Sequence, residues 1–230
     1  MRTRDPAIFG EQILKGEEYI VAIDGPAGAG KGTVAKYLAT YYRLKHLDTG
    51  LLYRLLGYKA NEKNVPFDNL QALMHVAATL DFNDLQDPRL RDESVGNLAS
   101  QISVFPEIRQ FLTSMMRRFC QDIAPPYQGA VLDGRDIGTV VCPDAHLKLF
   151  VTADPKVRAQ RRNHEMVAKG SAFEEQDSLS KINERDQRDQ NRAAAPLVMA
   201  GDAHLIDTTN LSIEQACEQA GSLLEQVLPF

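Results

Sequence analysis

A short apolar run, followed by a glycine-rich loop and a helical pattern, constrains this chain more than any other feature. Residues 19–23, YIVAI, are typical of a strand buried on both faces. The next residues, DGPAGAGKGT, combine several glycines with Lys31, and the apolar residues after them recur at helical spacing. When a strand, a glycine-rich loop and a helix follow one another in this order, the N–H groups of the loop point at one anion. The N-terminus of the helix points at the same anion. The sequence therefore predicts an α/β fold with a phosphate-binding loop (P-loop) at residues 25–33.

This loop predicts a nucleoside triphosphate site. Lys31 can reach the terminal phosphates, and the position after it is Gly32, where the general pattern has Ser or Thr. The hydroxyl follows one residue later as Thr33, and this GKGT ending is similar to the loop of nucleoside monophosphate kinases. The candidate ATP-binding residues are Gly25, Pro26, Ala27, Gly28, Ala29, Gly30, Lys31, Gly32 and Thr33.

Length and composition favour one α/β domain in a reducing compartment. The chain has 230 residues, of which 43% are apolar and 25% charged, and its net charge of −5 argues against nucleic acid as the main partner. No apolar run approaches the length of a membrane span, and residues 1–18 show no secretory signal. The three cysteines lack CxxC spacing. We expect a cytoplasmic enzyme with an N-terminal extension at residues 1–18.

A second informative stretch is AVLDGRDIGTVV, residues 130–141. Its first residues form a short apolar run, and Asp133 stands at the carboxyl end of the predicted strand. Ligands of open α/β sheets bind beyond this edge, and an Asp after a strand is where P-loop proteins hold magnesium. Arg135 and Asp136 follow in the same loop, where an internal Arg–Asp pair in a turn is the alternative.

A third stretch is basic and helical. Arg158, Arg161 and Arg162 lie three to four residues apart on one predicted helix face. In KINERDQRDQNR, residues 181–192, a single stripe holds Arg185, Arg188, Asp189 and Arg192. A solvated face is the usual interpretation of such a stripe, but guanidinium groups also match phosphate oxygens. In an acidic chain with a P-loop, we favour the phosphate role.

The segment between the P-loop and residue 130 is predicted to be mainly helical. Thr49 is a candidate helix N-cap, and Arg54 follows it among apolar neighbours. Ser100 falls on a predicted helix over residues 92–103, and Arg109 is expected beside the apolar face of the next helix. Residues 81–93 are expected to form a short polar insert.

The motifs GPAGAGKGT, HLDTGLLYR, ASQISVFPEIR, LDGRDIGTVVCPDA and INERDQRDQNRAAAPL, in this order, resemble the bacterial cytidylate kinase family. The resemblance runs from about residue 19 to the C-terminus. It implies a three-layer P-loop NTPase fold with a five-stranded parallel sheet, helices on both faces, a nucleotide-binding insert and a mobile lid. In this reading a core of residues 19–65, 104–155 and 193–230 carries the insert at 66–103 and the lid at 156–192. The segment at 81–93 is shorter than the strand-bearing insert of many family members.

The resemblance implies transfer of the γ-phosphoryl group of ATP to CMP or dCMP with Mg2+, by a monomer. The P-loop would hold ATP, and Thr33 and Asp133 would hold the metal. The implied CMP-binding residues are Thr49, Arg54, Ser100, Arg109, Arg135, Asp136, Arg185, Asp189 and Arg192. Lys31, with Arg158, Arg161 and Arg162 of the lid, would be catalytic. Thr49 stands where many relatives have Ser.

Physical chemistry is consistent with this implication. Phosphoryl transfer needs positioning and charge neutralisation, and a phosphate acceptor with a second pKa of about 6 needs no general base. A carboxylate such as Asp136 can accept a hydrogen bond from N4 of cytosine, and Arg109 can donate to its acceptor edge. Uracil has an oxygen in place of the amine, so Asp136 disfavours UMP.

Three alternatives stay open at this point. Another small-molecule kinase could act on AMP, UMP or a non-nucleotide acceptor, since adenine also carries an exocyclic amine. A GTPase-type switch would be expected to contain an N/TKxD motif, and the chain has none. An inactive nucleotide-binding regulator would not need the second phosphate site that the arginines suggest.

Overall fold

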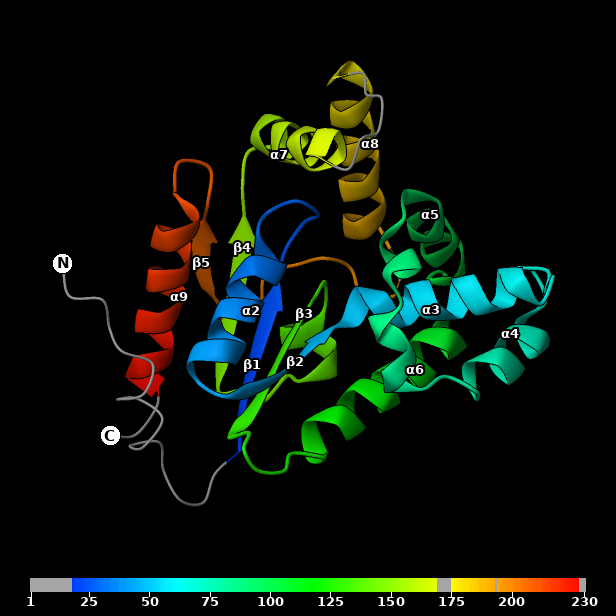
Figure 1. Ribbon diagram of the computed structural model, residues 1–230, viewed down its shortest axis with the longest axis horizontal. Helices are drawn as coiled ribbons and strands as arrows, with labels where there is room; N and C mark the ends of the chain where they lie inside the picture. Colours follow the sequence, from blue (N-terminus) through cyan, green and yellow to red (C-terminus); the bar gives the residue numbers. More distant parts are fainter. Residues whose placement is uncertain (1–17, 169–174, 193, 228–230) are drawn as a thin grey trace. The chain divides into compact units, whose positions relative to one another are not determined.

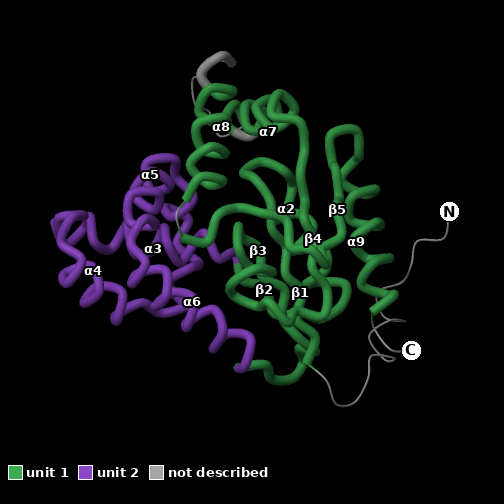
Figure 2. The backbone as a smooth tube through the Cα atoms, turned by 180° about the vertical axis from the view of Figure 1, so that it is seen from behind, with its two compact units in different colours: residues 1–47, 122–230 green, residues 48–121 purple. Residues whose placement is uncertain are grey.

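The computed structural model describes residues 18–168, 175–192 and 194–227, in two compact units (Figure 2). Unit 1 contains residues 1–47 and 122–230, and unit 2 contains residues 48–121. The predicted insert at 66–103 falls wholly within unit 2, and the described part of the predicted lid falls within unit 1. All but the last residue of the predicted extension, and the KGSAFE segment at 169–174, lie outside the described residues. The insert and lid boundaries stay predictions.

A five-stranded parallel sheet is the centre of unit 1, as the family resemblance implied (Figure 1). The order is β2-β3-β1-β4-β5, with β1 paired to both β3 and β4. The bounds are Tyr19–Asp24 for β1, Leu44–Asp48 for β2, Gly129–Gly134 for β3, Leu147–Thr152 for β4 and His204–Asp207 for β5. Strands β1 and β3 are buried along most of their length, which confirms the prediction of buried strands from their apolar runs.

The described helices of unit 1 are α2 (Lys31–Tyr41), α7 (Pro155–Ala168), α8 (Glu175–Gln190) and α9 (Ile213–Val227). Helices α2 and α9 pack together against the sheet, with Leu38, Cys217 and Leu224 in the shared apolar core. A capping box begins α9, because Gln215 N donates to Ser212 Oγ and Ser212 N donates to Gln215 Oε1.

The carboxyl edge of the sheet collects the loops that the sequence singled out. Strand β1 ends at Asp24 and continues into the P-loop, while its neighbour β3 carries Asp133 near its end. Gly25 has a φ of 145°, and a Cβ there would lie 1.9 Å from the carbonyl oxygen of Val151. Only glycine fits where the P-loop leaves the sheet.

Unit 2 is helical. It contains α3 (Thr49–Glu62), α4 (Leu70–Ala77), α5 (Glu93–Ile102) and α6 (Pro106–Gln121). The expected polar insert forms two 3-10 turns, η1 (Phe82–Gln86) and η2 (Pro88–Arg91). Helices α3 and α5 approach closely, since a Cβ on Gly57 would lie 2.9 Å from Cβ of Leu98. No helix in the described part of the chain is long and apolar enough to cross a membrane.

Three local expectations differ from the structure. The N-cap of α3 is Asp48, so Thr49 is the first helical residue instead of the cap. Helix α8 ends at Gln190, which leaves Arg192 beyond the helix and outside the predicted stripe. Arg109 was expected beside the apolar face of α6, but it is only 6% exposed. Each difference turns on a helix end or a tertiary contact that spacing alone does not reveal.

Candidate functional site

Lys31 is the buried centre of the P-loop. It begins α2, is 6% exposed, and its Nζ donates to the carbonyl oxygen of Pro26 at 2.7 Å. Burial lowers the pKa of Lys31 well below its usual value, and the positive charges of Arg135 and Arg185 lower it further. The negative charges of Asp133 and Asp24 act in the opposite direction. Cations therefore crowd this point of an acidic protein, which is the electrostatic setting that a polyphosphate would relieve.

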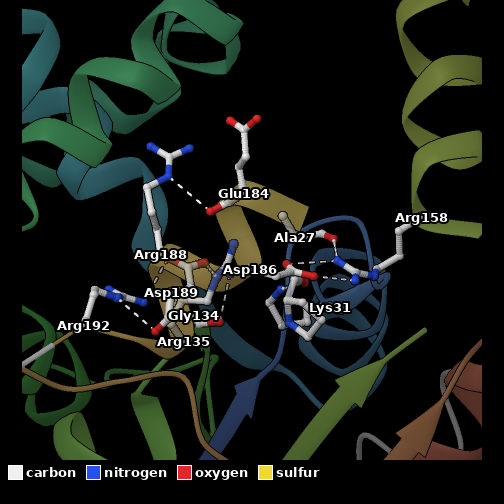
Figure 3. Close-up of polar contacts among 11 residues, drawn as sticks. Ala27, Lys31, Gly134, Arg135, Arg158, Glu184, Asp186, Arg188, Asp189 and Arg192 are labelled. Atoms are coloured by element: carbon white, nitrogen blue, oxygen red, sulfur yellow. Dashed lines mark hydrogen bonds and ion pairs between the residues drawn. The ribbon is translucent and has the colours of Figure 1, made fainter. Parts of the chain in front are cut away.

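Two arginines of α7 are linked by hydrogen bonds to carbonyl oxygens of the P-loop. Arg158 is 2% exposed, and its guanidinium donates to the carbonyl oxygen of Ala27 at 3.1 Å (Figure 3). It also donates to the carbonyl oxygen of Ala153 at 2.9 Å. Arg161 donates to both oxygens of Thr208, whose hydroxyl in turn lies 3.0 Å from the carbonyl oxygen of Ala29. Two P-loop carbonyls are thereby bound by groups of the protein.

Asp186 is a partner of Arg158 that the sequence analysis missed. It lies on α8 and accepts from both terminal nitrogens of Arg158, at 3.1 and 2.5 Å (Figure 3). This bidentate pair ties α7 to α8, with the two side chains 3% and 15% exposed. The RDQRDQ pattern contains two aspartates, and no sequence signal says which of them faces α7.

Asp189 holds two arginines at the end of α8. Its Oδ2 accepts from Nε of Arg135 at 2.7 Å, and its Oδ1 lies 3.1 Å from a terminal nitrogen of Arg192 (Figure 3). Burial raises the pKa of Asp189, but the charges of Arg135, Arg192 and Arg185 outweigh this effect and bring the pKa below its ordinary value. The group is an anionic anchor that orients guanidinium groups.

Asp24 joins the P-loop to the loop that carries Arg135 and Asp136. The carboxylate of Asp24 accepts from the backbone N–H groups of Ile137 (2.8 Å) and Gly138 (2.7 Å). These residues begin a π-helical turn, Ile137–Val141, whose N-cap residue is Asp136. Burial raises the pKa of Asp24 from 3.8 to about 6, against the effect of the two hydrogen bonds. A strand-ending Asp gave no signal of this role in the sequence.

The candidate metal ligands suit a hard divalent cation. Thr33 is exposed on the first turn of α2, and a Cβ on its neighbour Gly32 would lie 4.0 Å from Oδ2 of Asp133. A hydroxyl and a carboxylate oxygen match the preference of Mg2+, which takes its other ligands from water and phosphate. Among the described residues no group of three or more His, Cys, Asp or Glu side chains gathers as a metal-only site.

Four further predicted site residues lie on three helices of unit 2. Thr49 is buried at the start of α3, and Arg54 on the same helix donates to the carbonyl oxygens of Leu90 and Asp92, both at 2.8 Å. Arg109 on α6 lies 5.7 Å from the ring centre of Tyr53. Ser100 is half-buried on α5. The segment around η2 thus supplies two carbonyl oxygens that orient the side chain of Arg54.

Comparison with known proteins gives a consistent result. The family model described as Cytidylate kinase matches residues 21–226, a range that contains every predicted site residue. The cytidylate kinase of Afipia carboxidovorans is 47% identical over 207 residues, which cover 90% of this chain and 97% of that protein. The cytidylate kinase of Bradyrhizobium sp. is 46% identical over 208 residues, covering 90% and 96%. A solved structure of an uncharacterized protein from Eubacterium ventriosum is similar in fold, with a TM-score of 0.52 and 15% identity over 91% of this chain and 98% of that chain.

Proposed function

The chain belongs to the cytidylate kinase family, and we propose that its P-loop and the arginines described above carry out phosphoryl transfer from ATP to CMP or dCMP. The reaction, phosphorylation of CMP with ATP, follows from family membership. The assignment of individual residues is the proposal. The observation that supports it most is the crowding of Lys31 by Arg135 and Arg185.

ATP binds at the P-loop in this proposal. Backbone N–H groups of residues 25–33 surround its phosphates, and Lys31 reaches the terminal ones. Burial first, and then the charges of Arg135 and Arg185, lower the pKa of Lys31, and an incoming polyanion would offset the repulsion among these cations. Arg161 and Arg162, with Arg158, neutralise charge that develops during transfer.

CMP binds through cations and base-reading groups. Arg54, Arg135 and Arg192 hold its phosphate, while Arg185 and Asp189 contact the ribose. Asp136 accepts from N4 of cytosine, and Arg109 and Ser100 complete the contacts to the base. Thr49 contributes a hydroxyl to the same nucleotide.

Mg2+ accompanies ATP, held by Thr33 and Asp133. When bound, the cation supplies charge neutralisation at the transferring phosphate. The residues themselves position the two nucleotides and exclude water. No general base is required, because the acceptor phosphate is largely anionic at neutral pH.

The remaining proposals concern the setting of the enzyme. We expect a cytoplasmic monomer that acts on small molecules. Its net charge of −5 and its local cations at the P-loop fit nucleotides better than a nucleic-acid chain.

A substrate panel tests the proposed function. ATP and Mg2+ are supplied with CMP, dCMP, UMP, AMP or GMP, each beside a control without acceptor. We expect rapid turnover with CMP and dCMP, much slower turnover with AMP and GMP, and little hydrolysis of ATP alone, since water is excluded from the closed site. Turnover with none of the five acceptors, or rapid hydrolysis without acceptor, would contradict the proposal.

A further inference from the structure

A hydrogen bond between two neighbouring strands lies beside the P-loop. Nε2 of His46, on β2, is 2.8 Å from Oδ1 of Asp133, on β3. The side chains are 20% and 9% exposed. None of the roles described so far uses His46.

The direction of this bond follows from the groups involved. An ionised carboxylate only accepts, so Nε2 of His46 must carry the hydrogen and donate it. The bond occupies Oδ1 and restricts rotation of the carboxylate. The other oxygen, Oδ2, is the one close to Gly32 at the start of α2.

The strand fixes where the imidazole lies. Side chains alternate along a strand, so His46 projects to the face opposite Lys45 and Leu47. Leu47 is buried, and Lys45 is held by Asp122 on the other side of β2. His46 is therefore directed by two anchored neighbours.

We propose that His46 is a positioning residue for Asp133, and that it orients the carboxylate so that Oδ2 serves the nucleotide-bound Mg2+. This inference rests on the proposed function, in which Asp133 helps hold the cation. Partners of ligating carboxylates commonly have a large share in metal affinity, because they fix the ligand oxygen in place.

Loss of His46 has a second consequence in this proposal. The charge of Asp133 already acts on Lys31, which is the cation of the P-loop. A carboxylate released from His46 turns toward that cation. It then leaves the metal with a weaker ligand.

Calorimetric titration of the protein with ADP tests the proposal. Each variant is titrated once with Mg2+ and once with EDTA. The variants are His46→Leu, which removes the donor, and His46→Gln, which can keep one. His146→Leu is the matched control, since Nδ1 of His146 accepts from Ile20 N at 3.1 Å near the start of β1, away from the P-loop. Asp133→Asn tests the metal role of the carboxylate itself.

We expect His46→Leu to lose about tenfold or more of the affinity gained from Mg2+, with unchanged affinity for ADP in EDTA. His46→Gln should recover part of the loss, and His146→Leu should behave as the wild type. If Asp133→Asn weakens the Mg2+ effect but His46→Leu does not, the inference about His46 is overturned and the proposed function stands. If Asp133→Asn has no effect on Mg2+, the metal role of Asp133 fails and the inference fails with it.

Discussion

Arginines proposed for the nucleotide site have different kinds of partner in the two units. In unit 1, Arg135 and Arg192 both contact the carboxylate of Asp189, and Arg158 forms a bidentate pair with Asp186. In unit 2, Arg54 donates to two main-chain carbonyl oxygens, and Arg109 lies over an aromatic ring.

The difference lies in how much positive charge each contact leaves for a ligand. A carboxylate orients a guanidinium group strongly but cancels part of its charge, whereas a carbonyl or a ring orients it with the charge retained. Unit 1 brings several cations to one point near Lys31, so acidic partners offset their repulsion before nucleotides bind. The contacts of Arg54 and Arg109 named above are instead with two carbonyl oxygens and an aromatic ring, and these contacts orient the guanidinium groups.

The largest effect is expected at the point where cations crowd most. Lys31→Met should lower kcat/KM by about 10³-fold, because a preorganised charge next to the transferring phosphate is lost. Steady-state kinetics with ATP and CMP measures this change. Lys45→Met makes the same substitution at a lysine of β2 that is paired with Asp122. The kcat/KM of this variant should stay within about twofold of the wild-type value. Equal losses in both variants would show that the charge of Lys31 has no special role.

A buried and an exposed carboxylate of unit 1, Asp24 and Asp202, should make stability depend on pH in different ways. Because the pKa of folded Asp24 is about 6, against 3.8 ordinarily, the folded state holds a proton that the unfolded state releases between these values. The contribution of Asp24 to stability is therefore complete at low pH and is lost as pH rises through about 6. Relative to Asp24→Asn, the wild type should lose about 2 kcal/mol between about pH 4 and pH 7, as measured by urea unfolding.

Asp202→Asn is the control for this pH dependence. The hydrogen bond from Lys148 lowers the pKa of exposed Asp202. The contribution of Asp202 to stability is therefore expected to change only when the pH falls below the ordinary carboxyl pKa. The difference between wild type and Asp202→Asn should be flat from about pH 4 to pH 7. A flat profile for Asp24→Asn as well would contradict the buried, protonatable state of Asp24.

A pair of arginine variants tests the comparison between units directly. Arg135→Met removes one partner of a buried carboxylate and should destabilise the protein by about 2 kcal/mol, while Arg54→Met leaves neutral carbonyls and should cost about 1 kcal/mol. Both should raise KM for CMP about tenfold or more, since each removes a cation proposed for its phosphate. Denaturant unfolding and kinetics measure the two effects separately. A larger loss of stability in Arg54→Met would reverse the comparison.

A further prediction concerns base choice. Asp136→Ala should narrow the preference for CMP over UMP by about 1–3 kcal/mol, the value of one good base contact. The ratio of kcat/KM for the two acceptors measures it. An unchanged ratio would remove Asp136 from the cytosine site.

The sequence predicted the parts of the fold that depend on local pattern. The apolar run of β1 and the P-loop are each encoded within a few residues, and the structure contains them. The order of motifs also gave the five-stranded parallel sheet through its family resemblance.

Contacts between distant residues could not be predicted in this way. Asp24 binds backbone N–H groups more than a hundred residues away, and Asp186 meets Arg158 from a different helix. In the sequence His46 is an ordinary residue of a short strand, and its hydrogen bond with Asp133 forms only because β2 lies beside β3 in the sheet. Such pairs depend on which side chains the completed fold brings together, and they have no short-range signature.

The most direct measurement is calorimetric binding of adenosine and cytidine joined through their 5′ positions by five phosphates. If the cations around Lys31 serve both nucleotides at once, this compound should bind at least about 100-fold more tightly than ATP, and Lys31→Met should abolish most of the gain. An affinity no higher than that of ATP alone would contradict a cation cluster shared by donor and acceptor.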